Sequence, residues 1–284
     1  TVIDGGTGHA AGNTVTFGNI GTDGSTVQGG GMSNITITVV SASIGDVVYV
    51  KNGVYRETLP IRIPPGVTVQ GESLRGTEIR PADGAGHQVK TVTITSNVSG
   101  ASNGTYNFVT QAATNGSGAG FVANVVVGSG AVSSVTIYHG GYGYVVGNTI
   151  TLTIDGQSLV LTVASLENNN ASNMFLMNNS TNLVQMTMKG LITTPGAGGT
   201  GKAAVVSLDP TGSITVASPY VQNCSSVNAG ATGIQIDGNL HSAGNKSILA
   251  NDFTQINSDG RGVHALAGGR GEMVSIFTYY CDKS

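Results

Sequence analysis

Polar and apolar residues alternate along short stretches of this chain, which is the pattern of half-buried β-strands. Residues 35–40 (ITITVV) place Thr on one face and apolar side chains on the other. Apolar residues recur at every second position in residues 46–81, where four strands are expected at residues 47–50, 59–63, 67–70 and 78–80. Residues 174–177 and 183–188 predict two more strands, joined by an Asn-Ser-Thr-Asn turn. Short strands at roughly ten-residue spacing indicate a sandwich, a barrel or the coils of a parallel β-helix.

One block of turn and strand residues occurs twice. Residues 4–17 (DGGTGHAAGNTVTF) and 139–152 (HGGYGYVVGNTITL) are identical at seven of fourteen positions, and five of these seven are Gly or Asn. Gly and Asn accept left-handed turns, and each block continues into alternating Thr and apolar residues. We therefore predict two small Gly/Thr-rich β modules. Without the second module, Pro81 would lead almost directly to Asn173, which indicates that this module is an insertion.

The C-terminal third contains a longer repeat. Cys224 stands nine positions before Gly233, and Phe253 stands nine positions before Gly262. The unit that begins at Cys224 therefore begins again at Phe253. Phe253 is then matched by Phe277 in a slightly shorter second repeat. Repeats of roughly 24 to 29 residues are typical of one coil of a three-strand β-helix, whereas a sandwich predicts no such repeat.

These patterns predict an all-β fold, namely a right-handed parallel β-helix (β-solenoid) with small Gly/Thr-rich β modules. The expected domains are a Gly-rich module at residues 1–43, first coils at 44–83, an inserted module at 91–166 and the β-helix continuation at 171–284. The side chains expected to fill the stacked interior are Val67, Val69, Ile79, Phe175, Met186, Ile234, Ile236, Phe253 and Phe277.

Composition narrows the function classes. With 44 Gly, 10% charged residues and no Trp, the chain favours strands and turns over helices, and its 39% hydrophobic residues exclude a disordered chain. The net charge of −3 and the scattered 12 Lys and Arg argue against a nucleic-acid partner. Cys224 and Cys281 are expected to be small buried side chains, because their spacing suits neither a zinc site nor a disulfide-dense scaffold. A disulfide between them is the alternative.

No cofactor or metal motif is found, and the Asp residues lack the spacing of calcium-binding repeats. No apolar run is long enough for membrane insertion, and no charged-then-apolar leader is present. Because the chain begins at Thr1 and ends soon after an apolar strand, we expect it to be part of a longer protein.

Residues 46–72 (DVVYVKNGVYRETLPIRIPPGVTVQGE) resemble the opening coils of right-handed parallel β-helix proteins of the pectin-esterase and pectate-lyase superfamily, where a G-x-Y-x-E turn precedes the first full coils. The resemblance implies structural roles for Tyr55, which would cover the end of the core, and Glu57, which would bind backbone amides at the first corner. Pectin esterases also require a Trp and an LGRPW-like segment. This chain has neither, so the resemblance implies the fold and no esterase activity.

Residues 46–81 and 173–284 resemble, more specifically, a family of structural proteins on the virions of tailed phages that infect marine cyanobacteria. The segments that carry this likeness include NMFLMNNSTNLVQMTMKG, GIQIDGNLHSAGNKSILANDFTQI and VSIFTYYC. The Gly-rich blocks resemble repeats in fibre proteins of the same phages, with Asn13 and Asn148 in place of an Asp.

The resemblance implies a non-enzymatic virion structural protein, a tail fibre, spike or appendage of a cyanophage-like particle that presents modules to the host cell surface. The implied location is the virion, and the implied partners are other virion proteins, a host surface glycan and further copies in a homotrimer. Nothing in the residues themselves demands three chains. A depolymerase of host-envelope polysaccharide, either a glycoside hydrolase or a lyase, and a bacterial surface adhesin are the alternatives.

Three acidic residues are weak candidates for glycan cleavage. Asp252, Asp259 and Glu272 fall within one short stretch, which would allow two carboxylates to face each other across a groove. The structural alternative is a turn at Asp259 and solvated positions between coils for the other two. Asp237 and His241 form a similar turn with a lone His. We expect no catalytic residue among these groups.

A cluster of aromatic residues is a weak candidate for glycan contact. Tyr138, Tyr142 and Tyr144 lie beside His139, and aromatic faces pack well against the CH groups of a pyranose. The alternative is that these rings cover the Gly-rich backbone around them and shield a sheet edge.

Overall fold

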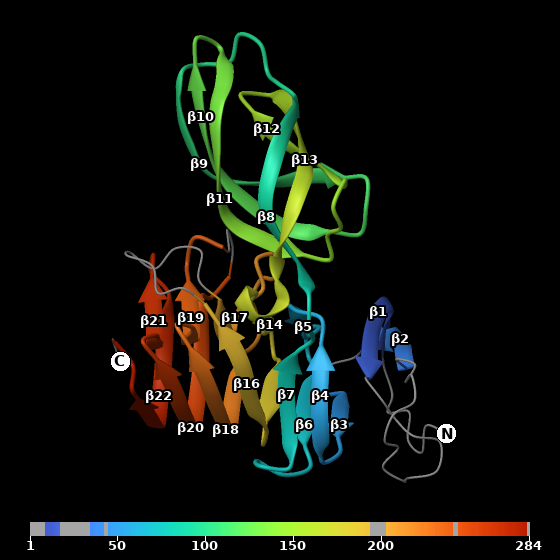
Figure 1. Ribbon diagram of the computed structural model, residues 1–284, viewed down its shortest axis with the longest axis vertical. Helices are drawn as coiled ribbons and strands as arrows, with labels where there is room; N and C mark the ends of the chain where they lie inside the picture. Colours follow the sequence, from blue (N-terminus) through green and yellow to red (C-terminus); the bar gives the residue numbers. More distant parts are fainter. Residues whose placement is uncertain (1–8, 18–34, 43–44, 194–202, 241–243, 283–284) are drawn as a thin grey trace.

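The computed structural model describes residues 9–17, 35–42, 45–193, 203–240 and 244–282 (Figure 1). Nearly all of its regular structure is β-strand, and the helical segment of the described ranges is the single 3-10 turn η1 (Asn169–Ala171). The prediction of an all-β chain is therefore confirmed.

Nine of the described strands form one long parallel sheet that bends at a corner. On one side of the corner lie β3 (Val47–Val50), β6 (Thr68–Gly71) and β15 (Asn182–Val184), and on the other lie β4 (Gly53–Glu57), β7 (Thr77–Pro81) and β16 (Thr187–Ile192). Three longer strands cross the corner: β18 (Tyr220–Ala229), β20 (Ser247–Ser258) and β22 (Arg270–Tyr279).

The corner of the long sheet is a column of residues with left-handed backbone. Gln185, Asn223, Asp252 and Ser275 have φ between 47° and 60°. The strand register places them at matching positions on successive strands, because the residues on either side of each corner pair with one another. A single left-handed residue turns each strand through the corner while the parallel pairing continues on both sides.

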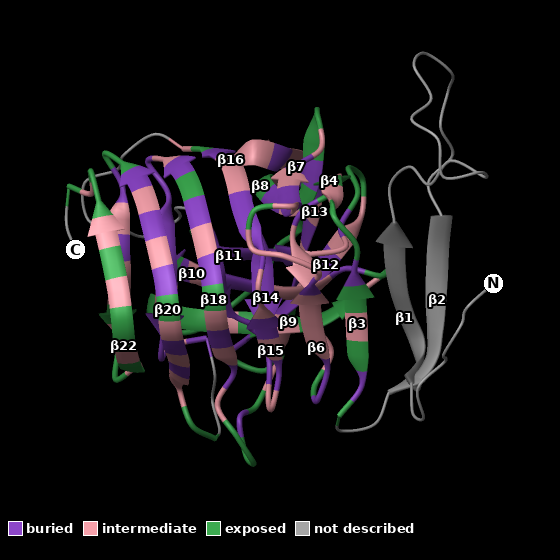
Figure 2. Ribbon diagram, turned by 90° about the horizontal axis from the view of Figure 1, so that it is seen from below, coloured by how far each residue is buried: buried purple, intermediate pink, exposed green. Residues whose placement is uncertain are grey.

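A second, five-stranded parallel sheet faces the long sheet. Its strands are β5 (Ile61–Arg62), β14 (Phe175–Met177), β17 (Ala204–Leu208), β19 (Thr232–Asp237) and β21 (Arg261–Leu266). We call this the short sheet. Buried and partly exposed residues alternate along β18 and β20 (Figure 2), so one face of the long sheet packs inward and the other faces out.

The core between the two sheets contains most of the predicted interior residues. The buried residues are Val67, Ile79, Phe175, Met186, Ile234, Ile236 and Phe253, and Val69 is half-buried against them. The prediction for Phe277 is wrong, because this side chain is 53% exposed.

A one-residue error in register explains the misplacement of Phe277. Cys224 pairs with Phe253, which confirms the first of the two predicted repeats. Phe253 pairs with Ile276 and not with Phe277, so the last repeat is one residue shorter than predicted. Ile276 packs against the core and Phe277 points outward, since a shift of one residue turns a strand side chain to the opposite face.

The G-x-Y-x-E segment is a strand and not a turn. It forms β4, which pairs in parallel with β7 from Gly53 to Glu57, so its backbone groups join the sheet. Tyr55 is half-buried against the core of the two sheets, and its hydroxyl donates to the carbonyl oxygen of Lys51 at 2.8 Å.

The strands between β7 and β14 form a nearly closed antiparallel barrel. They are β8 (Ala85–Ser96), β9 (Gly104–Thr114), β10 (Ala119–Gly128), β11 (Ala131–Tyr142), β12 (Thr149–Ile154) and β13 (Gln157–Asn168), paired in the order β11-β10-β9-β12-β13-β8. The two end strands, β8 and β11, contact each other. The barrel has its own core, which includes Phe121, Tyr144, Leu152 and Leu161.

Strands β1 (His9–Phe17) and β2 (Ile35–Ala42) form a separate antiparallel pair. The duplicated block therefore ends in a strand in both copies, β1 in the first and β12 in the second. Residues 4–8, the start of the first copy, lie outside the described residues.

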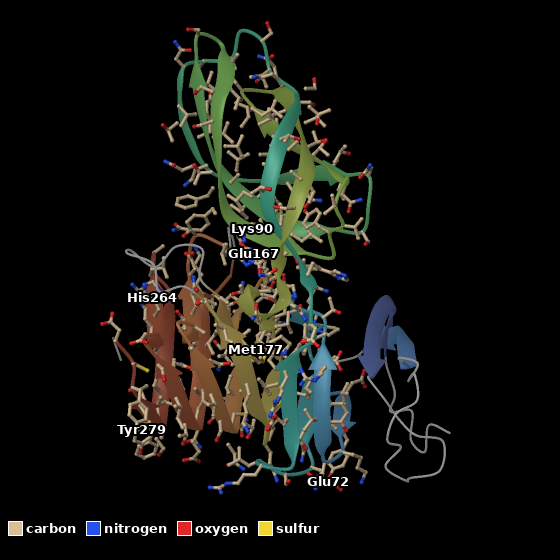
Figure 3. The ribbon with its side chains drawn as sticks, in the orientation of Figure 1. Glu72, Lys90, Glu167, Met177, His264 and Tyr279 are labelled. Carbon is tan, nitrogen blue, oxygen red and sulfur yellow. The ribbon has the colours of Figure 1, made fainter. Side chains whose placement is uncertain are left out.

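Asn169 fixes the base of the barrel to the parallel sheets. Its side-chain oxygen accepts a hydrogen bond from the backbone of Leu59 at 2.6 Å, and its amide donates to the carbonyl oxygens of Glu57 at 2.7 Å and Ala82 at 3.0 Å. Lys90 and Glu167 form an ion pair at 3.4 Å in the same region (Figure 3). The barrel thus leaves and rejoins the parallel sheets at one point, above which it projects (Figure 1).

Candidate functional site

The predicted aromatic cluster lies where the barrel meets the parallel sheets. Strand β11 and the turn after it carry Tyr138, His139, Tyr142 and Tyr144. Three of these four contact the parallel-sheet part of the molecule, and the fourth is enclosed in the barrel. We call this contact region the junction.

Tyr138 connects the barrel to strand β19. Its hydroxyl donates to Oδ2 of Asp237 at 2.5 Å and accepts from the side-chain amide of Asn239 at 3.1 Å. Asp237 is 3% exposed, so this contact gives a buried carboxylate one of its donors. Burial and then the bond to Asp237 raise the pKa of Tyr138 to about 12, which keeps the hydroxyl protonated and able to donate.

Tyr142 lies over a partly buried ion pair. The guanidinium of Arg62 on β5 binds Oδ2 of Asp209 at 2.5 Å, and its central carbon lies 5.5 Å from the centre of the Tyr142 ring. The hydroxyl of Tyr142 lies 3.0 Å from the hydroxyl of Thr211, whose own side chain donates to Asp209 at 2.7 Å. Burial, and next the charge of Asp209, raise the pKa of Tyr142.

His139 is buried and held from two directions. Its Nδ1 accepts from the backbone of Gly141 at 3.0 Å, and its Nε2 lies 3.2 Å from the side-chain amide of Asn173. The backbone of Asn173 donates to Gln88 of the barrel at 3.1 Å. The small polar pocket beside these residues has a volume of about 30 Å³, which is room for one water molecule and not for a sugar ring.

Tyr144 belongs to the barrel core. It is completely buried, its ring meets Phe121 edge to face at 6.5 Å, and its hydroxyl donates to Gln111. Burial raises its pKa. The rings of Tyr144 and His139 are therefore closed to an external glycan, and Tyr138 and Tyr142 direct their hydroxyls into the junction. In this structure the cluster holds the two parts of the protein together.

The three acidic candidates are spread along the end of the long sheet. Asp252 occupies the corner column, and Asp259 follows the end of β20, seven positions later and about 23 Å away in an extended strand. Glu272 pairs with Leu249, which separates its Cα from that of Asp252 by about 11 Å. All three side chains are exposed. A glycosidase needs two carboxyl groups about 5 to 9.5 Å apart. Asp259 lies too far from Asp252 to form such a pair, and Asp252 and Glu272 are the nearer two.

His241, the partner expected for Asp237, lies outside the described residues. Arg261 contacts the ring of His264 at 3.2 Å, and burial, followed by the Arg261 charge, lowers the pKa of His264. A cationic neighbour and a lowered pKa keep this imidazole neutral near pH 7.

The outward face of the long sheet carries a row of residues that sequence reasoning missed. Strand register aligns one outward residue from each of β4, β7, β16, β18, β20 and β22. We call these residues the outer row: Arg56, Arg80, Lys189, Val227, Ile256 and Tyr279. Six neighbouring strands give the row a length of about 24 Å. Tyr279 lies at its free end, on the edge of the sheet (Figure 3).

The outer row has a basic half and an apolar half. In the basic half, Glu78 accepts hydrogen bonds from both Arg80 and Lys189, the latter at 2.6 Å. Burial raises the pKa of Glu78, but the bonds from Lys189 and Arg80 outweigh it and leave the pKa below the ordinary value of 4.5. In the apolar half, Val227 is 39% and Tyr279 49% exposed.

No family model, curated protein or solved structure matches this chain. Within the described ranges, no group of three or more His, Cys, Asp or Glu side chains could hold a metal ion. Among the same residues, no helix has the length and apolar character needed to cross a membrane. Both cysteines are free, Cys224 buried and Cys281 partly exposed. The geometry of the junction and of the outer row is thus the basis for an argument about function.

Proposed function

We propose that this protein is a non-enzymatic structural component of a phage particle, a tail fibre, spike or appendage of a cyanophage-like virion that presents modules to the host cell surface. The observation that carries the proposal is the junction. A self-contained barrel stands on a stack of parallel strands and is held there by polar contacts from Tyr138, Tyr142 and His139. This is the construction expected of a support that displays a module in a fixed orientation.

The proposal includes a right-handed parallel β-helix as the architecture of the support. Three observations favour it: the strands pair in parallel, the repeat that relates Cys224 to Phe253 recurs in both sheets, and a cluster of buried apolar side chains lies between the sheets. The right hand follows from the general rule that crossover connections between parallel strands are right-handed in about 98% of cases. Each coil contacts only its neighbours, which suits a component that lengthens by repetition.

Attachment to a host cell by such a protein does not require one high-affinity binding site. Several copies on one particle bind a repetitive surface together, and weak glycan contacts add up to firm attachment when their geometry allows simultaneous binding. Other virion proteins, further copies of this chain in a trimer and a host surface glycan are the partners in this proposal.

The first experiment places the protein on the particle. Antibodies raised against the purified chain are applied to purified cyanophage virions, and bound gold label is located by electron microscopy. Label on tails or appendages, together with the chain in the virion mass spectrum, supports the proposal. Detection of the chain in uninfected cells and not in virions would refute it and favour a bacterial adhesin.

A second assay separates attachment from cleavage. The purified chain is incubated with cyanobacterial envelope polysaccharide, and new reducing ends and retention on cells are both measured. We expect retention without new reducing ends. Release of reducing ends that is lost in an Asp259→Asn, Glu272→Gln variant would instead establish a depolymerase.

A further inference from the structure

The basic half of the outer row places three cations side by side. Arg56 pairs with Arg80 in the parallel register, and Lys189 occupies the same position on the next strand. Neighbouring strands lie about 4.8 Å apart, so the three side chains leave the sheet as a ladder of like charges. Like charges directly opposite each other on a sheet are destabilising, which means that this arrangement works against folding.

The three cations have too few acidic partners to neutralise their charge. Glu78 is the acidic partner of both Arg80 and Lys189, and it is 7% exposed. No carboxylate of the described residues forms an ion pair with Arg56, which is exposed. Three positive groups and one negative group leave a local charge of +2 on a chain whose net charge is −3. An anion bound along the row would remove the repulsion.

The apolar half of the row adds a second kind of contact. Val227, Ile256 and Tyr279 continue the same line of outward positions, and Phe277 lies two positions before Tyr279 on the same face of β22. Phe277 is 53% and Tyr279 49% exposed, so both rings are open to solvent. Aromatic rings at the end of a partly apolar surface pack well against the CH faces of sugars.

We propose that the outer row binds an anionic polysaccharide, a glycan chain with sulfate or carboxylate groups. Its anionic groups lie on Arg56, Arg80 and Lys189, and its sugar rings pack on Tyr279 and the apolar positions before it. This inference rests on the proposed function, because it names the class of host-surface ligand that the protein contacts. It moves the glycan surface from the aromatic cluster of the junction to the long sheet.

A polysaccharide fits the row better than a nucleic acid. Nucleic acids carry a charge on every nucleotide and are bound through many basic contacts, whereas this row offers three. Half of the row is apolar and exposes aromatic rings, which suits the CH faces of sugars better than a phosphate backbone.

The test uses the intact chain and two charge variants. Binding of immobilised chain to dextran sulfate, polygalacturonate, uncharged dextran and double-stranded DNA is measured by interferometry over a series of NaCl concentrations. Arg56→Gln removes the exposed cation of the row. Arg270→Gln, on the other part of β22, removes another exposed cation outside the row and is the matched control.

We expect binding to one or both of the anionic polysaccharides, little binding to dextran, and affinity that falls as salt rises. Arg56→Gln should weaken binding by about fivefold, the upper range for one exposed ion pair, while Arg270→Gln should leave it unchanged. Tyr279→Ala should weaken binding by about two- to tenfold through the loss of stacking. The two anionic polymers distinguish sulfate from carboxylate recognition.

Two results would overturn the inference: equal losses in the Arg56 and Arg270 variants, or tighter binding to DNA than to either anionic polysaccharide. Failure here is distinguishable from failure of the proposed function. A chain that labels virion appendages and adheres to host cells regardless of Arg56 retains its function and lacks this site. If the chain is absent from virions but its Arg56→Gln variant binds polysaccharide more weakly, the binding site exists and the proposed location on the virion is wrong.

Discussion

Replacement of Phe253 by Ala tests the register of the last strands of the long sheet. Phe253 is completely buried between Cys224 on β18 and Ile276 on β22. Loss of the ring removes a transfer contribution of about 1.5 to 3 kcal/mol. A residual cavity of about 80 Å³ would add about 2 kcal/mol at 24 cal/mol per Å³. The free energy of unfolding should therefore fall by about 3 to 5 kcal/mol.

Phe277→Ala is the matched control, because it deletes the same ring one strand away. Phe277 pairs with Thr254 and is 53% exposed, so its loss should lower the free energy of unfolding by less than about 1 kcal/mol. Urea unfolding of both variants, followed by far-UV circular dichroism, measures the two values with the slope of each transition. Similar losses in both variants would contradict the pairing of Phe253 with Ile276 and restore the alignment of the two phenylalanines.

Three further results are expected. Tyr138→Phe leaves the buried carboxylate of Asp237 without one donor and should cost about 1 to 3 kcal/mol in urea unfolding; no loss would contradict a closed junction. Gly238→Ala places a Cβ 1.9 Å from the backbone oxygen of Ala267 and should cost about 1 to 3 kcal/mol, read as a lower melting temperature. Because the pKa of Glu78 is lowered, its stabilising effect is complete above about pH 4.5 and is lost as pH falls through the lowered pKa; Glu78→Gln should flatten the acid side of a stability–pH profile.

The strand content and the repeat could be read from the sequence because both are local properties. Alternation of polar and apolar residues places the strands, and the spacing of Cys224 and Phe253 gives the pairing of β18 with β20 without further information. In the last repeat, where the spacing is shorter, the sequence does not decide which residue aligns with Phe253. SIFTYY offers two adjacent apolar side chains, Ile276 and Phe277. Burial of Ile276 against the core decides between them, and burial is a property of the folded chain.

The outer row could not be predicted because its members meet only after folding. Arg80 and Lys189 are separated in sequence by the entire barrel, so the 12 basic residues appear scattered along the chain. The signal that could have found the row is the register itself. Once β7 and β16 are paired, Arg80 and Lys189 fall on one line, and Arg56 follows from the pairing of β4 with β7.

The aromatic cluster was visible in the sequence, but its surroundings were not. Tyr138 and Tyr142 look like exposed aromatic residues when only the Gly-rich strand that carries them is considered. Their partners, Asp237 and Arg62, come from strands of the parallel sheet on either side of the insertion. The surface that Tyr138 and Tyr142 contact therefore belongs to another part of the molecule, which the local sequence does not show.

The position of the barrel explains how a module can be added to such a stack with little cost. Asn182 hydrogen-bonds to Thr68 across an interval of 114 residues, and β15 pairs with β6 as though the barrel were absent. The ends of the insertion are adjacent, because Asn168 pairs with Ala85 and β13 runs beside β8. Any module whose ends meet in this way could occupy the same connection, between β7 and β14, without breaking the parallel ladders. The barrel and the outer row can therefore change independently of each other on one stack of parallel strands.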